Sequence, residues 1–132
     1  ATMGTNTSYT AAMNRLLGFG SNPAGFQYHH LVEKWAANTA RFHETAINSL
    51  ANLVPTPTSI HYAINGLYSR TLPFEAQRAF GNMRTLREIL SSQTFESQYR
   101  IGLEIWQYAM VNQVTTLRFE QIENIVMRYA RP

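Results

Sequence analysis

The chain has 132 residues, of which 45% are apolar and 14% are charged, and its formal net charge is +3. This length provides one domain with a substantial core, and the absence of cysteine excludes a disulfide framework, thiol catalysis and cysteine-ligated zinc. Ordinary globular proteins carry about 25% charged residues, so much of this surface is polar but uncharged. Such surfaces suit repeated docking on other surfaces, because few full charges have to be desolvated.

The first twenty residues, ATMGTNTSYTAAMNRLLGFG, contain neither the cationic start nor the apolar stretch of a signal peptide. No run of eighteen apolar residues occurs in the sequence, so we expect a soluble, uncleaved chain. A weak helix is predicted over residues 7–17, ending at the glycines of Gly18-Phe19-Gly20. Residues 1–22 are therefore expected to form an N-terminal arm.

A helix of about three times the usual length is predicted next, over residues 23–54. Ser21 or Asn22 is its expected N-cap, and Pro23 suits the first helical position. The segment VPTPTS then ends the helix, because its prolines cannot continue it.

Four shorter helices are predicted after this stop. They cover the segments SIHYAINGLYS, starting at Thr56 or Pro57; FEAQRAFGNMRTLREIL, starting at Thr71 to Pro73; FESQYRIGLEIWQYAMVN, capped by Ser92 or Thr94; and LRFEQIENIVMRYA, capped by Thr115 or Thr116. The third of these is the expected centre, because apolar residues occur on nearly all its sides: Phe95, Tyr99, Gly102, Leu103, Trp106, Ala109 and Met110. The prediction is an all-α protein in which the helical domain, residues 23–132, ends in an up-and-down four-helix bundle over residues 55–132.

The predicted long helix carries a polar stripe without acid. At about 100° per residue, one side of this helix collects eight polar residues: Gln27, His30, Lys34, Asn38, Arg41, Thr45, Asn48 and Asn52. The two carboxylates of the segment, Glu33 and Glu44, fall on another side. These amides, hydroxyls and cations are the groups that donate to phosphate oxygens without reading base sequence. The stripe therefore predicts contact with a nucleic-acid backbone, with a solvated helix face as the alternative.

Residues 1–32 contain no carboxylate, so Asn14 and Arg15 are added to the predicted nucleic-acid contacts. Arg70 is included as well. Three further arginines, Arg78, Arg84 and Arg87, are left open between DNA contact and contact within or between subunits, because Arg84 and Glu88 have the spacing of a helix pair.

No catalytic or metal-binding motif is found in the sequence. The pair His29-His30 with Glu33 lacks the spacing of a zinc-protease helix, and GFGSNPAG lacks the lysine of a phosphate-binding loop. We therefore expect no enzyme activity, no cofactor and no metal. A helix-turn-helix regulator is disfavoured, because the segment Pro23-Ala24-Gly25-Phe26 offers bases almost nothing. The remaining alternative is a helical adaptor that binds only protein.

Several segments together resemble the major coat proteins of filamentous archaeal viruses. These are the short arm, the turn LLGFGSNPAGFQ, the long helix after it, and GLYSRTLPFEAQRAFGNMRTLREI before two final helices. The resemblance spans essentially the whole chain. It is closest to the enveloped lipothrixviruses, of the Acidianus filamentous virus kind, and more distant to the rod-shaped rudiviruses.

The resemblance implies a structural coat protein, made in the host cytoplasm and located in the virion. It implies that the arm and long helix wrap linear double-stranded DNA in the A form, while a four-helix bundle forms the outer shell. The implied partners are the viral genome, a second copy or a paralogous coat protein in a dimer, and an outer lipid envelope in the enveloped members.

Overall fold

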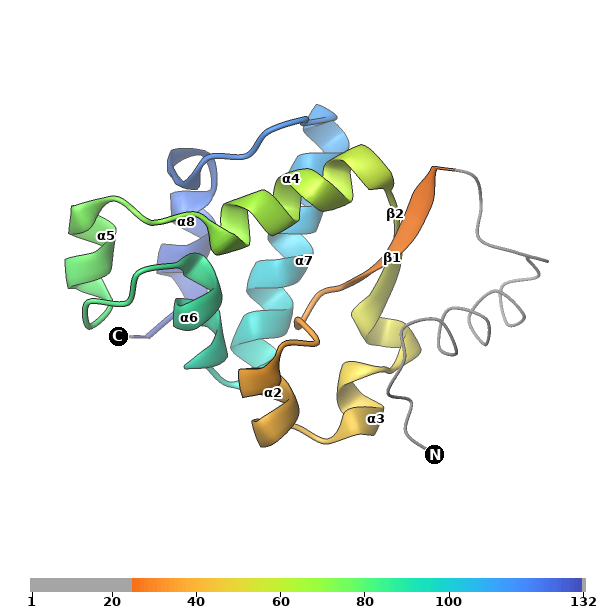
Figure 1. Ribbon diagram of the computed structural model, residues 1–132, viewed down its shortest axis with the longest axis horizontal. Helices are drawn as coiled ribbons and strands as arrows, with labels where there is room; N and C mark the ends of the chain where they lie inside the picture. Colours follow the sequence, from red (N-terminus) through yellow and green to blue (C-terminus); the bar gives the residue numbers. More distant parts are fainter. Residues whose placement is uncertain (1–24, 132) are drawn as a thin grey trace. The chain divides into compact units, whose positions relative to one another are not determined.

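The computed structural model describes residues 25–131, and its secondary structure is mixed α/β. In this range the chain forms seven α-helices, one short 3-10 helix and two β-strands (Figure 1). The expectation of an all-α protein with an up-and-down four-helix bundle is therefore wrong. The chain divides into two compact units, Ala1–Thr58 and Ser59–Pro132, and each is described by itself.

The first unit is built on a two-stranded antiparallel sheet. Strand β1 covers Phe26–His30 and strand β2 covers Leu53–Pro57, with Phe26 opposite Pro57 and His30 opposite Leu53. The connection between the strands holds three short elements: α2 (Ala36–Arg41), α3 (Glu44–Ile47) and the 3-10 helix η1 (Leu50–Asn52).

The single helix expected over residues 23–54 does not form in the part that the structure describes. Trp35 and Phe42, on either side of α2, have extended backbone, with ψ angles of 151° and 147°. Asn, Thr, His and aromatic residues are only moderate helix formers, so local propensity gives this segment little support as one long helix. The sequence FQYHH pairs instead with LVPTP, whose prolines favour an extended backbone.

The prolines of β2 occupy positions that do not need a ladder donor. Leu31 N donates to Asn52 O at 2.9 Å and Thr58 N donates to Gly25 O at 2.8 Å, which sets the alternation of bonded pairs along the ladder. In this register Pro55 and Pro57 fall at the non-bonded pairs, so their missing N–H groups lie on the side away from β1. The sheet therefore loses no hydrogen bond to its two prolines.

The second unit is helical and contains one hydrophobic core. Its helices are α4 (Thr58–Ser69, which begins at the last residue of the first unit), α5 (Phe74–Ala79), α6 (Leu86–Ser91), α7 (Phe95–Asn112) and α8 (Phe119–Tyr129). The largest fully buried side chains of this core are Tyr68, Ile64, Leu67, Leu86, Ile89, Ile101, Ile105, Leu117 and Ile122.

Helix α7 confirms the expected bounds of the central helix. Thr94 is its N-cap and accepts a hydrogen bond from Ser97 N at 3.1 Å. The buried side agrees only in part with the expected residues: Gly102 and Ala109 are buried, but Trp106 is only partly buried against the core. Ile101 and Ile105, which were not among the expected residues, are fully buried. The broad apolar character of α7 identified its importance but could not select which side is covered.

The helix expected from Thr71–Pro73 to Leu90 is divided into α5 and α6. Gly81 and Asn82 both have positive φ angles, 68° and 64°, and two consecutive left-handed residues end a right-handed helix. Thr85 then caps α6 by accepting from Glu88 N at 3.2 Å. Each of these helices has six residues against eighteen in α7, so neither can run along α7 as a bundle partner.

Candidate nucleic-acid interface

The ten residues predicted to contact nucleic acid do not share one helical face. Asn14 and Arg15 lie outside the described residues. The other eight are distributed over β1, the loop after it, α2, α3 and the residues that follow α3 and α4: Gln27, His30, Lys34, Asn38, Arg41, Thr45, Asn48 and Arg70. The predicted stripe required one long helix, at about 1.5 Å per residue, and that helix is absent from the described part of the first unit.

Three of these residues are used inside the first unit. Asn38 is 2% exposed, and its Nδ2 donates to the carbonyl oxygen of Glu33 at 2.9 Å. His30 Nε2 lies 3.2 Å from Asn48 Oδ1, which ties the end of β1 to the end of α3. Asn38 and Asn48 are buried and bond groups of the protein itself, so their side chains are not available to a phosphate, whereas His30 is only partly buried.

Asn52, the eighth member of the expected stripe, makes three hydrogen bonds within the unit. Its Oδ1 accepts from Val32 N at 2.7 Å, and its Nδ2 donates to Val32 O at 3.0 Å and to Ile47 O at 2.7 Å. The side chain is fully buried. Asn52 therefore joins the chain after β1 to the chain at the end of α3.

The polar surface that remains is concentrated between residues 39 and 45. Arg41 and Thr45 are exposed, as are Thr39, His43 and Glu44. The Arg41 guanidinium lies 4.7 Å from the centre of the Phe42 ring, and Thr45 Oγ1 lies 2.8 Å from His43 Nδ1. These contacts hold a cation and two polar side chains at the junction of α2 and α3.

Two other predicted residues are half-buried in the same unit. Gln27 lies in β1 opposite Thr56, and Lys34 lies in the loop between β1 and α2. No long helix joins these two residues to Arg41, so the expected helical periodicity does not bring the three side chains together.

Arg70 belongs to the second unit, where it lines a pocket of about 440 Å³. Its Nη1 donates to the carbonyl oxygen of Leu117 at 2.6 Å, which fixes the guanidinium against the segment before α8. The other lining residues come from the α4–α5 connection and from the start of α8: Thr71, Leu72, Pro73, Thr116, Arg118, Phe119 and Glu120.

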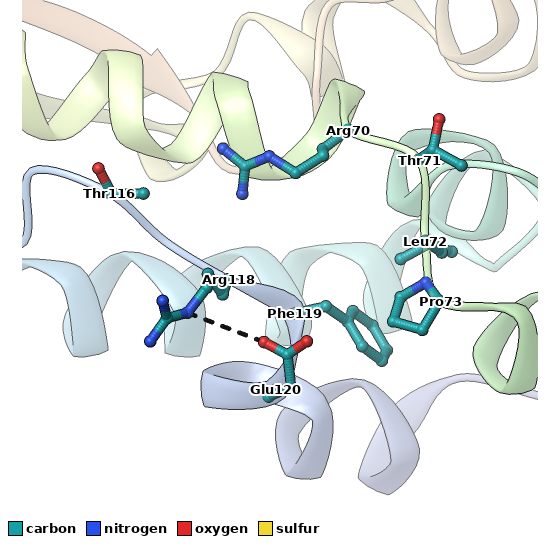
Figure 2. Close-up of a pocket in the computed structure, with 8 residues that line it drawn as sticks. All are labelled: Arg70, Thr71, Leu72, Pro73, Thr116, Arg118, Phe119 and Glu120. Carbon is teal, nitrogen blue, oxygen red and sulfur yellow. Dashed lines mark ion pairs between the residues drawn. The ribbon is translucent and has the colours of Figure 1, made fainter.

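The pocket has a polar and an apolar part. Figure 2 shows Arg70, Thr116 and Arg118 toward one end, with Leu72, Pro73 and Phe119 toward the other. Arg118 Nε lies 4.0 Å from Glu120 Oε2, and both side chains are mostly exposed to solvent. An exposed pair at this distance is weak, so Arg118 can exchange Glu120 for another carboxylate at little cost.

Sequence reasoning does not identify this pocket. From the sequence, Arg118 is only part of a helix start expected at Thr115 or Thr116. Helix α8 starts later, at Phe119, and the Gln121 side chain accepts from Arg118 N at 2.8 Å. Gln121 is only a weak signal for this boundary, because an arginine side chain cannot accept the second hydrogen bond of a capping box. The pocket itself depends on a contact between segments 47 residues apart.

In comparisons with known proteins, no protein-family model matches the chain, and no curated protein or solved structure matches it significantly. In the described residues, no group of three or more acidic or histidine side chains is arranged to hold a metal ion. No helix within residues 25–131 is both long and apolar enough to cross a membrane.

Proposed function

We propose that this protein is a structural coat protein that packages linear double-stranded DNA in a helical filament, without sequence specificity. The observation that carries the proposal is the absence of any carboxylate from residues 1–32. Nonspecific binding depends mainly on charge neutralisation of phosphates, and a segment without acid avoids repelling them. The resemblance of the whole chain to filamentous virus coat proteins supports the same function.

Within the described residues of the first unit, fewer side chains are candidates for DNA contact than the sequence pattern suggested. Arg41 and Thr45 are exposed and remain candidates for phosphate contact, together with Arg15 and Asn14 of the arm. Asn38 and Asn48 are withdrawn from the proposed contacts, because their side chains are buried and hydrogen-bonded within the unit. The cations, rather than a row of amides, are proposed to provide the affinity.

A salt titration tests this proposal directly. Binding of the full chain to a random-sequence duplex should weaken as salt rises, and two duplexes of unrelated sequence should give the same affinity. Replacing Arg15 and Arg41 together with glutamine should reduce the slope of log affinity against log salt by about 0.9 for each phosphate that is no longer neutralised. Circular dichroism should show unchanged helix content, because Arg41 is exposed.

Arg100→Gln is the matched control. Arg100 is exposed in the second unit and pairs with Glu96 at 3.2 Å on the same helix. Its replacement should leave both affinity and slope at the wild-type values. Electron microscopy of wild-type protein with linear duplex should show filaments. If wild-type protein does not bind duplex, or if the double variant keeps the wild-type slope, the adaptor alternative is favoured.

A further inference from the structure

We infer that the pocket beside Arg70 receives the Phe74–Glu75 segment of a second copy of this chain. The inference rests on the proposed coat function, because the copies of a coat protein must associate with each other. It specifies one contact between two copies. Only the second unit is involved, because the pocket and the docking segment both lie there.

The lining of the pocket suits a ligand that has an apolar group next to an anionic group. The apolar surface of the pocket comes from the exposed Pro73 and from the small accessible parts of Leu72 and Phe119, which are otherwise buried in the core. Arg70 and Arg118 offer guanidinium groups beside it (Figure 2). The carbonyl of Leu117 takes only one of the five N–H donors of Arg70, and planar guanidinium groups are suited to binding carboxylates. An aromatic side chain followed by an acidic one has this combination.

The chain itself exposes such a pair. Phe74, the first residue of α5, is 79% exposed and is the most exposed aromatic side chain among residues 25–131. Glu75 follows it in the first turn and is also exposed. An aromatic ring on the surface gains most when it enters a pocket on a partner, since rings carry a large apolar area with few rotatable bonds.

The position of this pair favours reciprocal docking. Pro73 lines the pocket, and Phe74 is the next residue, so the docking side chain and the pocket are adjacent on the surface of one copy. When a projecting group and its recess are adjacent, a two-fold axis between them lets each copy fill the pocket of the other. Phe74 would then contact the apolar end, and Glu75 would pair with Arg118 or Arg70 of the second copy.

The contact is small, so the expected association is weak in solution. Each pocket has eight lining residues and receives two residues of the second copy, whereas a stable interface uses about 20–30 residues on each side. Within a filament this contact would join copies in pairs, and the high local concentration of neighbouring copies would favour it.

Analytical ultracentrifugation of the full chain without DNA tests the inference. Wild-type protein should show a concentration-dependent dimer, and Phe74→Ala should raise the dissociation constant by roughly tenfold or more. Glu75→Arg should also weaken the dimer, because it places a cation against Arg70 and Arg118. Val111→Ala is the control, since Val111 is 81% exposed at the end of α7 and lies outside the pocket.

Mixing two defective variants makes the test specific. Thr116→Trp fills the polar end of the pocket but keeps Phe74, whereas Phe74→Ala keeps an open pocket. Each variant alone should dimerise poorly, and a mixture should recover dimer through the one contact that remains intact. Fluorescence anisotropy with one labelled variant measures this recovery.

Three results would overturn the inference. They are a wild-type chain that stays monomeric at about 1 mM, equal effects of Phe74→Ala and Val111→Ala, and no recovery on mixing. Because no DNA is present, these results leave the proposed DNA binding untouched. Equally, a chain that fails to bind duplex can still form this dimer.

Discussion

At the scale of single residues, the asparagines of the first unit explain its unusual composition. Short helices and a two-stranded sheet leave many backbone groups without a regular partner, and each buried group without one is costly. Asn38, Asn48 and Asn52 are buried and bond backbone or side-chain groups inside the unit. Neutral amides do this without the desolvation cost of a charge. The abundance of amides thus has a structural cause in this segment.

Asn52→Ala should destabilise the first unit by about 2–3 kcal/mol, because it leaves Val32 N and two carbonyl oxygens without their buried partner. Urea unfolding followed by the fluorescence of Trp35, in a Trp106→Phe background, measures the change. Asn112→Ala is the control, since that exposed amide bonds Tyr108 O in α7 and its replacement should cost within about 0.5 kcal/mol. Equal effects of the two changes would contradict the internal role of Asn52.

His61 should make stability depend on pH. Burial lowers the pKa of His61 below its usual value near 6.5, so the unfolded chain binds the proton more readily than the folded chain. Stability should therefore be present above about pH 6.5 and should be lost as pH falls below it. His61→Gln keeps a group able to bond Asn65, 3.2 Å from His61 Nε2 in α4, and should flatten this dependence.

Thermal melts between about pH 5 and pH 7.5 measure this difference, with wild type and His61→Gln compared at each pH. His43→Asn is the matched control, because His43 is exposed and an asparagine can still cap α3. An identical pH dependence in wild type and His61→Gln would show that burial of this imidazole does not affect folding.

At the scale of elements, the sequence predicted those helices whose ends depend on interactions within one segment. The cap and length of α7 were predictable, because Thr94 and eighteen helix-compatible residues act within one segment. The pairing of β1 with β2 was not predictable. Phe26 and Pro57 are 31 positions apart in the sequence, and the periodicity of one segment does not indicate which distant segment pairs with it. The predicted stripe depended on the long helix, which does not form in the described residues, so its members are separated: Arg41 and Thr45 are exposed, whereas Asn38 and Asn48 are buried.

Two glycines of the second unit should respond in opposite directions to alanine. Gly81 has a φ of 68°, which strains any residue with a Cβ, so Gly81→Ala should destabilise by about 1 kcal/mol or more. Gly66 lies within α4, and an added Cβ would meet Arg70 Nη2 at an ordinary 3.5 Å. Gly66→Ala should therefore stabilise by about 0.5–1 kcal/mol through helix propensity. Urea midpoints give both values. A stabilising Gly81→Ala would contradict the boundary between α5 and α6, and a destabilising Gly66→Ala would contradict the open surroundings of Gly66 in α4.

At the scale of the whole molecule, we propose a different role for each of the two units. The core of the second unit is complete within residues 60–130, and it carries the pocket and Phe74. The acid-free segment and Arg41 belong to residues 1–58. Self-association and DNA binding are therefore proposed to be separable properties of one chain.

A fragment of residues 58–132 tests this division. It should fold alone, with a helical circular dichroism spectrum and a cooperative melt, because every residue of its hydrophobic core is present. It should dimerise with the wild-type dissociation constant and lose that association on Phe74→Ala. It should not bind duplex at about 100 mM salt, where the full chain does, because the first unit provides the proposed phosphate contacts. A fragment that binds duplex as tightly as the full chain would move the DNA-contacting surface to the arginines of the second unit, and the first unit would then need another role.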